Sequence, residues 1–155
     1  CGIYSAEEFK ENSSRYDRVL YHFGNSHFHH YMIELLQSLP GLVVLHDFFL
    51  SGLMYSYGEI NSIKDFFFEK ELAYSHGRIL DENLEPHELI VKYPCNKRVL
   101  QDALAIISHS NYSFTLATDW YGDLYSTKFT EIPLLKVPKE FNRDNSRKKL
   151  NLSQI

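Results

Sequence analysis

The sequence is poor in the features that mark several large functional classes. Only two of its 155 residues are cysteines, Cys1 and Cys95, which excludes a disulfide framework and favours a reducing compartment. Its 16 basic and 20 acidic residues give a formal net charge of −4, so it lacks the basic excess by which many nucleic-acid-binding domains attract phosphates. Apolar runs such as Gly41–Leu45 have the length of a β-strand, and none approaches the ~20 residues that cross a membrane. We therefore expect a cytoplasmic protein with no nucleic-acid partner.

Several catalytic motifs are missing as well. The sequence contains neither the G-x-x-x-x-G-K-[ST] loop of P-loop NTPases nor the G-x-G-x-x-G fingerprint of dinucleotide-binding domains. It also lacks the G-x-S-x-G turn of many hydrolases and the H-E-x-x-H pair of zinc peptidases. Four histidines, His22, His27, His29 and His30, lie close together, but without such a pair or nearby cysteines they are better explained as structural or pocket-lining groups. We expect no metal site, and a zinc enzyme remains an alternative that bound zinc would reveal.

The residues that are present are sufficient for one folded domain. Hydrophobic residues make up 44% of the chain. The apolar runs Arg18–Phe23 and Leu42–Leu45 are separated by Ser26–Leu39, whose apolar residues have helical spacing, and this order within about thirty residues is typical of a βαβ unit. Two more strands are expected at Leu104–Ser108 and Lys128–Ile132. The sequence therefore predicts an α/β fold, a Rossmann-like parallel sheet flanked by helices, whose apolar strands are buried on both faces.

The rest of the chain is expected to form helices, one loop and a charged tail. The apolar spacing predicts further helices at 6–11, 48–57, 62–77, 96–104 and 111–120. The acidic stretch 80–92, interrupted by Pro86, is expected to be a loop. The charged tail, 139–155, has few aromatic residues and is expected to be a linker or helical extension that follows a domain of residues 1–138.

Polar side chains follow three of the predicted strands. In an open parallel sheet the ligand binds at the carboxyl ends of the strands, where these residues would share one edge. His22 ends the first strand and would share this edge. The candidate site residues are Gly24, Asn25 and Ser26 after the first strand, His46 and Asp47 after the second, and Ser108 and His109 after the third. The sequence therefore predicts a ligand site at this edge.

Each of these groups also has a purely structural explanation. Gly24-Asn25-Ser26 offers backbone N–H groups to a phosphate, carboxylate or sugar hydroxyl, but the same residues form ordinary turns with a serine cap. His46 and Asp47 could place an imidazole and a carboxylate on a substrate, or Asp47 could cap the next helix while His46 binds backbone. An imidazole is an unusual end to so apolar a strand, and this favours a functional role for His46.

The order and spacing of these residues resemble a known family. Tyr21–Ser26 (YHFGNS), His29 and Pro40–Asp47 (PGLVVLHD) resemble the amino-terminal half of GT-B type glycosyltransferases of family 4. Tyr93–Leu100, followed by Ile106–Ser110 (IISHS), is similar to a helix and a strand of the same family. Ile132-Pro133-Leu134 is similar to the end of the strand that follows. The resemblance covers approximately residues 17–138.

The resemblance implies an enzyme with two Rossmann-like domains facing each other across a cleft. Residues 1–138 would be part of the amino-terminal, acceptor-side domain, and 139–155 would lead into a carboxy-terminal domain that binds the nucleotide-sugar. The family's first strand with its glycine-rich loop, and its pair of donor-contacting glutamates, have no counterpart in this sequence. We therefore expect the chain to be part of a larger enzyme and to be inactive alone.

The implied reaction is transfer of a hexosyl group from a nucleoside diphosphate sugar to an acceptor hydroxyl, with retention of the anomeric configuration. By resemblance, His46 is the catalytic residue facing the donor sugar. Gly24, Asn25 and His29 would shape the acceptor side, with Ser26, Asp47, Ser108 and His109 as further substrate contacts. The donor would be a substrate, so no cofactor is implied.

The partners expected are the nucleotide-sugar donor, a sugar or lipid-linked acceptor, and the missing domain. Peripheral contact with the inner membrane surface, through the aromatic-rich helical region at 62–77, stays open. The alternative function is a non-catalytic domain that binds a sugar, a nucleotide or another protein. The complete reading frame would separate the two functions.

Overall fold

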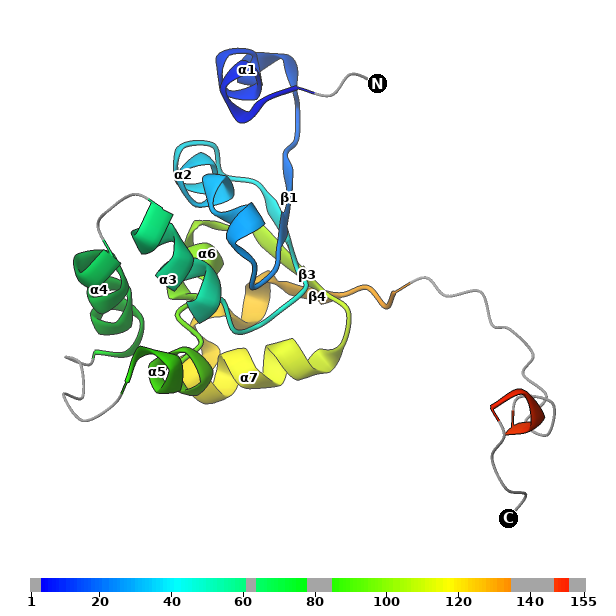
Figure 1. Cartoon of the computed structure of the whole chain (residues 1–155). Coiled ribbons are helices and arrows are strands. Elements are labelled where there is room, and N and C mark those ends of the chain that lie inside the picture. Colours follow the sequence, from blue (N-terminus) through cyan, green and yellow to red (C-terminus); the bar gives the residue numbers. More distant parts are fainter. Residues whose placement is uncertain (1–3, 61–63, 78–84, 135–146, 151–155) are drawn as a thin grey trace.

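The computed structural model describes residues 4–60, 64–77, 85–134 and 147–150 (Figure 1). Its strands are β1 (Leu20–Phe23), β2 (Leu42–Leu45), β3 (Ala105–Ser108) and β4 (Phe129–Glu131). Its α-helices are α1 (Ala6–Glu11), α2 (Tyr31–Ser38), α3 (Ser51–Ile60), α4 (Lys64–His76), α5 (Pro86–Lys92), α6 (Lys97–Asp102) and α7 (Asn111–Tyr121). Three 3-10 helices complete the elements: η1 (Ser13–Arg15), η2 (His27–His29) and η3 (Gly122–Lys128).

The strands form one parallel sheet in the order β1-β2-β3-β4. Leu20 of β1 is paired with Leu42 of β2, which is paired in turn with Ala105 of β3. The predicted α/β fold with a parallel sheet and flanking helices is therefore confirmed, and it is compatible with a Rossmann-like fold. β2 has the predicted bounds, and α1 does too.

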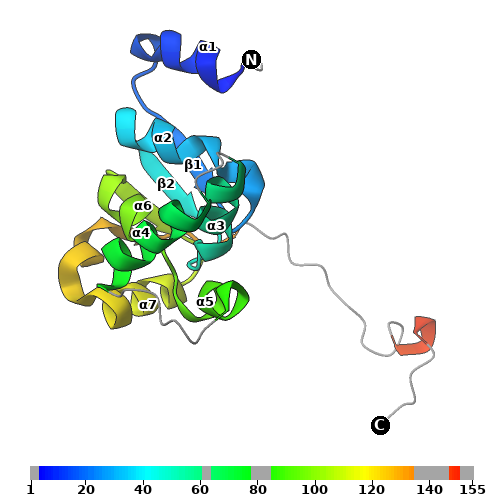
Figure 2. The ribbon, with the colours of Figure 1, turned by 60° about the vertical axis from the view of Figure 1, so that its left-hand side comes forward.

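The helices α2, α3 and α6 lie on one side of the sheet (Figures 1 and 2). In β1, Tyr21 and Phe23 are buried toward this side, whereas Leu20 and His22 are exposed, and β3 alternates in a similar way. The prediction of burial on both faces is therefore wrong for β1, whereas the outward residues of β3, Ala105 and Ile107, are half-buried. Connections between neighbouring parallel strands are right-handed. Because the strand order β1-β2-β3-β4 advances across the sheet in one direction, the helices of all these connections are expected on the same face.

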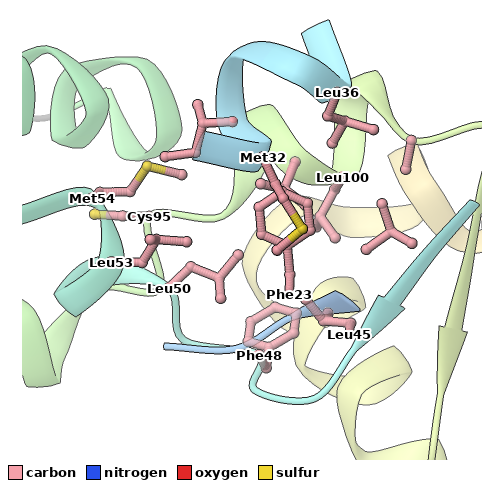
Figure 3. Packing of buried hydrophobic residues seen from close by; sticks show 14 of the residues in the cluster. Phe23, Met32, Leu36, Leu45, Phe48, Leu50, Leu53, Met54, Cys95 and Leu100 are labelled. Carbon is pink, nitrogen blue, oxygen red and sulfur yellow. The ribbon is translucent and has the colours of Figure 1, made fainter. Parts of the chain in front are cut away.

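The core lies between the sheet and these helices (Figure 3). Phe23 and Leu45 from the strands meet Leu36, Leu53 and Leu100 from the helices, and all five are at most 1% exposed. Burial of such a side chain contributes about 1.5–3 kcal/mol. Packing on this face therefore holds the strands in place, and with them the carboxyl edge of the sheet.

Two predicted segments differ from the structure. Pro86–Lys92 is the helix α5, not a loop, because Pro86 stands at its first turn, where a missing N–H costs nothing. Glu85 and Glu88 complete a capping box there. The segment Ser26–Leu39 is not one continuous helix: it divides into η2 and α2, and His30 lies between them.

A buried ion pair joins α4 to α6. Glu71 is 1% exposed, and its Oε1 accepts hydrogen bonds from Nε of Arg98, at 2.8 Å, and from the Arg98 Nη2. The hydrogen bond and charge of Glu71 raise the pKa of Arg98, and burial opposes them only in part. Arg98 therefore stays charged, and it compensates the charge of a carboxylate that is shielded from water.

Other expectations fall partly outside the described residues. Of the tail 139–155, only 147–150 are described, and of the expected loop 80–92 the residues before Glu85 are not. Among the aromatic residues proposed for membrane contact, Phe68 is buried at 4% exposure and packs edge-on against Tyr55. No described helix has the combination of length and apolar character required to cross a membrane.

Candidate functional site

Three imidazoles form a row across the carboxyl end of the sheet. His22 lies on β1, His46 directly follows β2, and His109 directly follows β3. The Nδ1 of His22 is 3.0 Å from Nε2 of His46, and these two rings are stacked with centroids 5.3 Å apart. The ring centroids of His46 and His109 are 5.2 Å apart. We call His22, His46 and His109 the histidine row.

The register of the strands explains this arrangement. His22 is paired with Val44, so His46, two residues further along, points to the same face. Leu45 is paired with Ser108, which places the next residues, His46 and His109, beside each other. The whole row therefore lies on the face turned away from the helices, and buried residues of β1 and β2 hold it from behind.

Backbone groups orient the imidazoles. The backbone N–H of His46 donates to the carbonyl of Phe23 at 2.8 Å. The carbonyl of Ile132 accepts from Nδ1 of His109 at 2.9 Å, so that Nε2 carries a lone pair. This Nε2 is buried and has no hydrogen-bond partner within the described structure. His109 therefore presents an unused acceptor beside the row.

The surroundings of His46 favour its neutral form. Burial lowers its pKa below the ordinary value, and the neighbouring His22 and His109 lower it further, while Asp47 opposes the shift. His46 is therefore neutral at pH 7. A neutral imidazole offers one donor and one acceptor, which suits it to bind hydroxyl groups or to exchange a proton with them.

The turn after β1 is tied to the row by Asn25 and Asp47. The backbone N–H of Asn25 donates to Oδ2 of Asp47 at 2.8 Å, and Oδ1 of Asn25 accepts from the backbone N–H of Leu53 at 3.0 Å. Asp47 thus holds the turn, and Asn25 caps the first turn of α3. The helix cap that the sequence suggested for Asp47 is therefore provided by Asn25, and the carboxylate of Asp47 binds the turn instead.

Gly24 stands at the centre of this turn. A Cβ atom at Gly24 would lie 3.2 Å from Oδ2 of Asp47 and 3.6 Å from Nε2 of His29. His29 is itself fixed by a 2.6 Å hydrogen bond between its Nδ1 and the carbonyl of His22. Gly24, His29 and Asp47 therefore converge on one place beside the histidine row.

The two predicted serines lie differently. Ser26 caps η2, since its Oγ accepts from the N–H of Phe28 at 3.5 Å. Ser108 is 1% exposed, and its hydroxyl donates to the carbonyl of Ser110 at 3.0 Å. Alternation along β3 directs Ser108 into the core, so the structure does not place its hydroxyl at the edge of the sheet.

His22 was expected from the sequence to share this edge, at the end of the first strand, and the structure brings it into the row. The alternation of side chains along a strand indicates the same position, because His22 stands between the buried Tyr21 and Phe23 and therefore faces away from the core. His27 and His30 do not join the row: their contact is with each other, through Nδ1 of His30 and the carbonyl of His27.

No described group of three or more His, Cys, Asp or Glu side chains has a geometry that could hold a metal ion. Compared with known proteins, the chain matches no family model, no curated protein and no solved structure.

Proposed function

We propose that this edge of the sheet is the acceptor-side half of a glycosyltransferase site. The enzyme would transfer a hexosyl group from a nucleoside diphosphate sugar to an acceptor hydroxyl, with retention of configuration, and would belong to the GT-B type. The observation that carries the proposal is the histidine row with the Gly24 turn beside it. Three imidazoles and a turn from separate parts of the chain meet at the carboxyl ends of parallel strands, the usual ligand edge of such sheets.

The chemistry of the row fits sugar hydroxyls. His46 is neutral at pH 7 because burial and the neighbouring imidazoles lower its pKa. Its Nε2 faces His22, which leaves Nδ1 for a substrate hydroxyl. Nε2 of His109 would provide a further contact after a ring movement that exposes it, and Asp47 and His29, which lie beside Gly24, would contact the acceptor sugar. In this proposal His46 is the catalytic residue, and the other groups position the two sugars.

The charge of the edge indicates that a second lobe is required. A nucleoside diphosphate carries negative charge that must be compensated as it leaves. The groups that meet here are imidazoles and the carboxylate of Asp47, and none supplies a permanent positive charge. A carboxy-terminal domain would therefore hold the diphosphate, and we expect no turnover by the 155-residue chain alone.

The test is kinetic and uses the complete two-domain enzyme that the proposal requires. His46→Ala should lower kcat by about 10²–10³, the usual effect of removing one group that binds the transition state. His27→Ala is the matched control, because His27 is exposed nearby but does not belong to the row. Equal activity of both variants would remove His46 from the reaction. Saturable sugar binding without any turnover would instead assign the edge to a non-catalytic binding domain.

A further inference from the structure

The carboxyl ends of α4, α5 and α7 lie close together on the helical side of the molecule (Figure 1). Residues at these ends line a cavity that is separate from the histidine row. Its volume is about 610 Å³, within the range of ligand pockets. No member of the histidine row lines it. The residues that determine its chemistry are Ser75, His76, Lys92, Tyr93, Lys97 and Trp120.

One wall of the cavity is aromatic. The rings of Tyr93 and Trp120 have centroids 6.0 Å apart, and His76 lies 5.1 Å from Tyr93 and 5.0 Å from Trp120. Trp120 is only half-buried, so its indole is partly open to the cavity. The rings of Tyr93 and Trp120 meet at 61°, and the half-buried Trp120 offers an apolar ring face against which the C–H face of a ring-shaped ligand can pack.

The mouth of the cavity is positively charged. Lys92 and Lys97 both line it, and among the described residues around it there is no carboxylate. The Nζ of Lys97 donates to the carbonyl of Tyr74 at 3.2 Å, which holds this ammonium group near the opening. Lys92 lies with its Nζ 5.4 Å from the centroid of the Tyr93 ring. Two ammonium groups beside an aromatic wall favour an anionic group on the ligand.

His76 contributes a neutral ring. Its Nε2 accepts from the backbone N–H of Cys95 at 3.3 Å, so the remaining ring hydrogen is on Nδ1. Burial lowers the pKa of His76 to about 4, and Lys97 contributes to this shift. At neutral pH the two lysines are therefore the permanently charged groups among the described lining residues.

Ser75 provides an independent sign that a ligand is expected. The residue is 5% exposed, and its Oγ has no hydrogen-bond partner in the part of the chain that the structure describes. Leaving a buried hydroxyl unpaired costs about 1–3 kcal/mol, and native structures usually provide a partner. Ser75 lines the cavity, and a change of its side-chain rotamer that brings the Oγ to the cavity would let a hydroxyl group of a bound molecule supply one.

We propose that this cavity binds a phosphorylated sugar. The pyranose ring would pack against Trp120 and Tyr93, its phosphate would pair with Lys92 and Lys97, and one of its hydroxyls would bind Ser75. The proposal shares no residue with the histidine row and stands whether or not the row transfers sugars.

The chain contains a single tryptophan, Trp120, so its fluorescence reports on this cavity alone. We would titrate the 155-residue protein with glucose 6-phosphate, and with glucose and inorganic phosphate separately. A saturable fluorescence change is expected with glucose 6-phosphate, with an affinity at least tenfold higher than for either half of the molecule. A Kd of about 1 mM would give nine-tenths occupancy at about 10 mM, so a lack of saturation up to this concentration would overturn the proposal. An equal affinity for inorganic phosphate would overturn it as well.

Two sets of variants test the assigned contacts. The double variant Lys92→Gln/Lys97→Gln should weaken binding at least tenfold, and Lys10→Gln on α1 is the matched control. Equal weakening by the control would show a nonspecific charge effect and overturn the assignment. Ser75→Ala should lower the affinity severalfold without lowering Tm, because the hydroxyl is unpaired in the ligand-free protein. A lower Tm with unchanged affinity would show that the hydroxyl serves the fold and not the ligand.

Discussion

The Nδ1 atom of His22 lies 3.0 Å from Nε2 of His46, although the two residues are 24 positions apart in the sequence. At this distance one of the two nitrogens carries a hydrogen and the other accepts it. If both rings were doubly protonated at the same time, this hydrogen bond would be lost. The parallel register of β1 and β2 produces this pairing, and His109 extends it onto β3. The edge of the sheet therefore offers several imidazole hydrogen-bonding groups at a spacing set by the strands.

The first prediction concerns the cap of α3. Asn25→Ala removes the acceptor for the N–H of Leu53, and loss of such a cap costs about 0.5–2 kcal/mol. We expect the free energy of unfolding, measured by urea denaturation, to fall by this amount. Asn111→Ala, at an exposed position in the first turn of α7, is the control and should change it by less than about 0.5 kcal/mol. Equal losses in the two variants would contradict a special role for Asn25.

Disruption of the ion pair between Glu71 and Arg98 should lower the free energy of unfolding by more than loss of the Asn25 cap does. Arg98→Met leaves the buried carboxylate of Glu71 without its partner, and breaking a buried pair in this way costs about 3–5 kcal/mol. The double variant Glu71→Leu/Arg98→Met removes the charge as well, so it should recover most of the lost stability. Chemical denaturation of the two variants checks this. A double variant no more stable than Arg98→Met would show that the uncompensated charge is not the cause.

His76 makes the stability depend on pH. Its pKa is about 4 in the folded protein, below the ordinary 6.5, because burial disfavours the charged form. Between pH 6.5 and 4 the unfolded chain therefore binds a proton that the folded protein does not, and stability falls as the pH falls. We expect His76→Gln to lose less stability than the unchanged protein when the pH drops from 7 to 5. Parallel thermal melts at the two pH values give the comparison, and identical losses would contradict it.

Local patterns predicted much of the fold and part of the site. The apolar run Leu42–Leu45 was sufficient to predict β2. Four consecutive apolar residues between a turn and a polar pair are too short for a helix and are typical of a buried strand. Placing His46 and His109 near each other followed from their positions after parallel strands. Which face each side chain occupies required the register, and this is why Ser108 was expected at the edge although it points into the core.

Other features depend on contacts between distant segments. Pro86 suggested a break, and only its position at the first turn of α5 reveals that it starts a helix. The pairing of Glu71 with Arg98 spans 27 positions and leaves no local pattern. Trp120 meets Tyr93 only because α7 packs beside the end of α5. Packing decides such contacts, and a single sequence does not specify it in advance.

The central proposal, that the histidine row receives a sugar, can be tested on the complete two-domain enzyme, because its carboxy-terminal domain would hold the donor. The measurement is the NMR spectrum of the histidine imidazoles during titration with UDP-glucose, UDP-N-acetylglucosamine and GDP-mannose. With at least one of these donors, the signals of His22, His46 and His109 should shift saturably, while those of His27 and His87, outside the row, should stay unchanged. Shifts spread evenly over all the histidines, or none with any donor, would contradict the account.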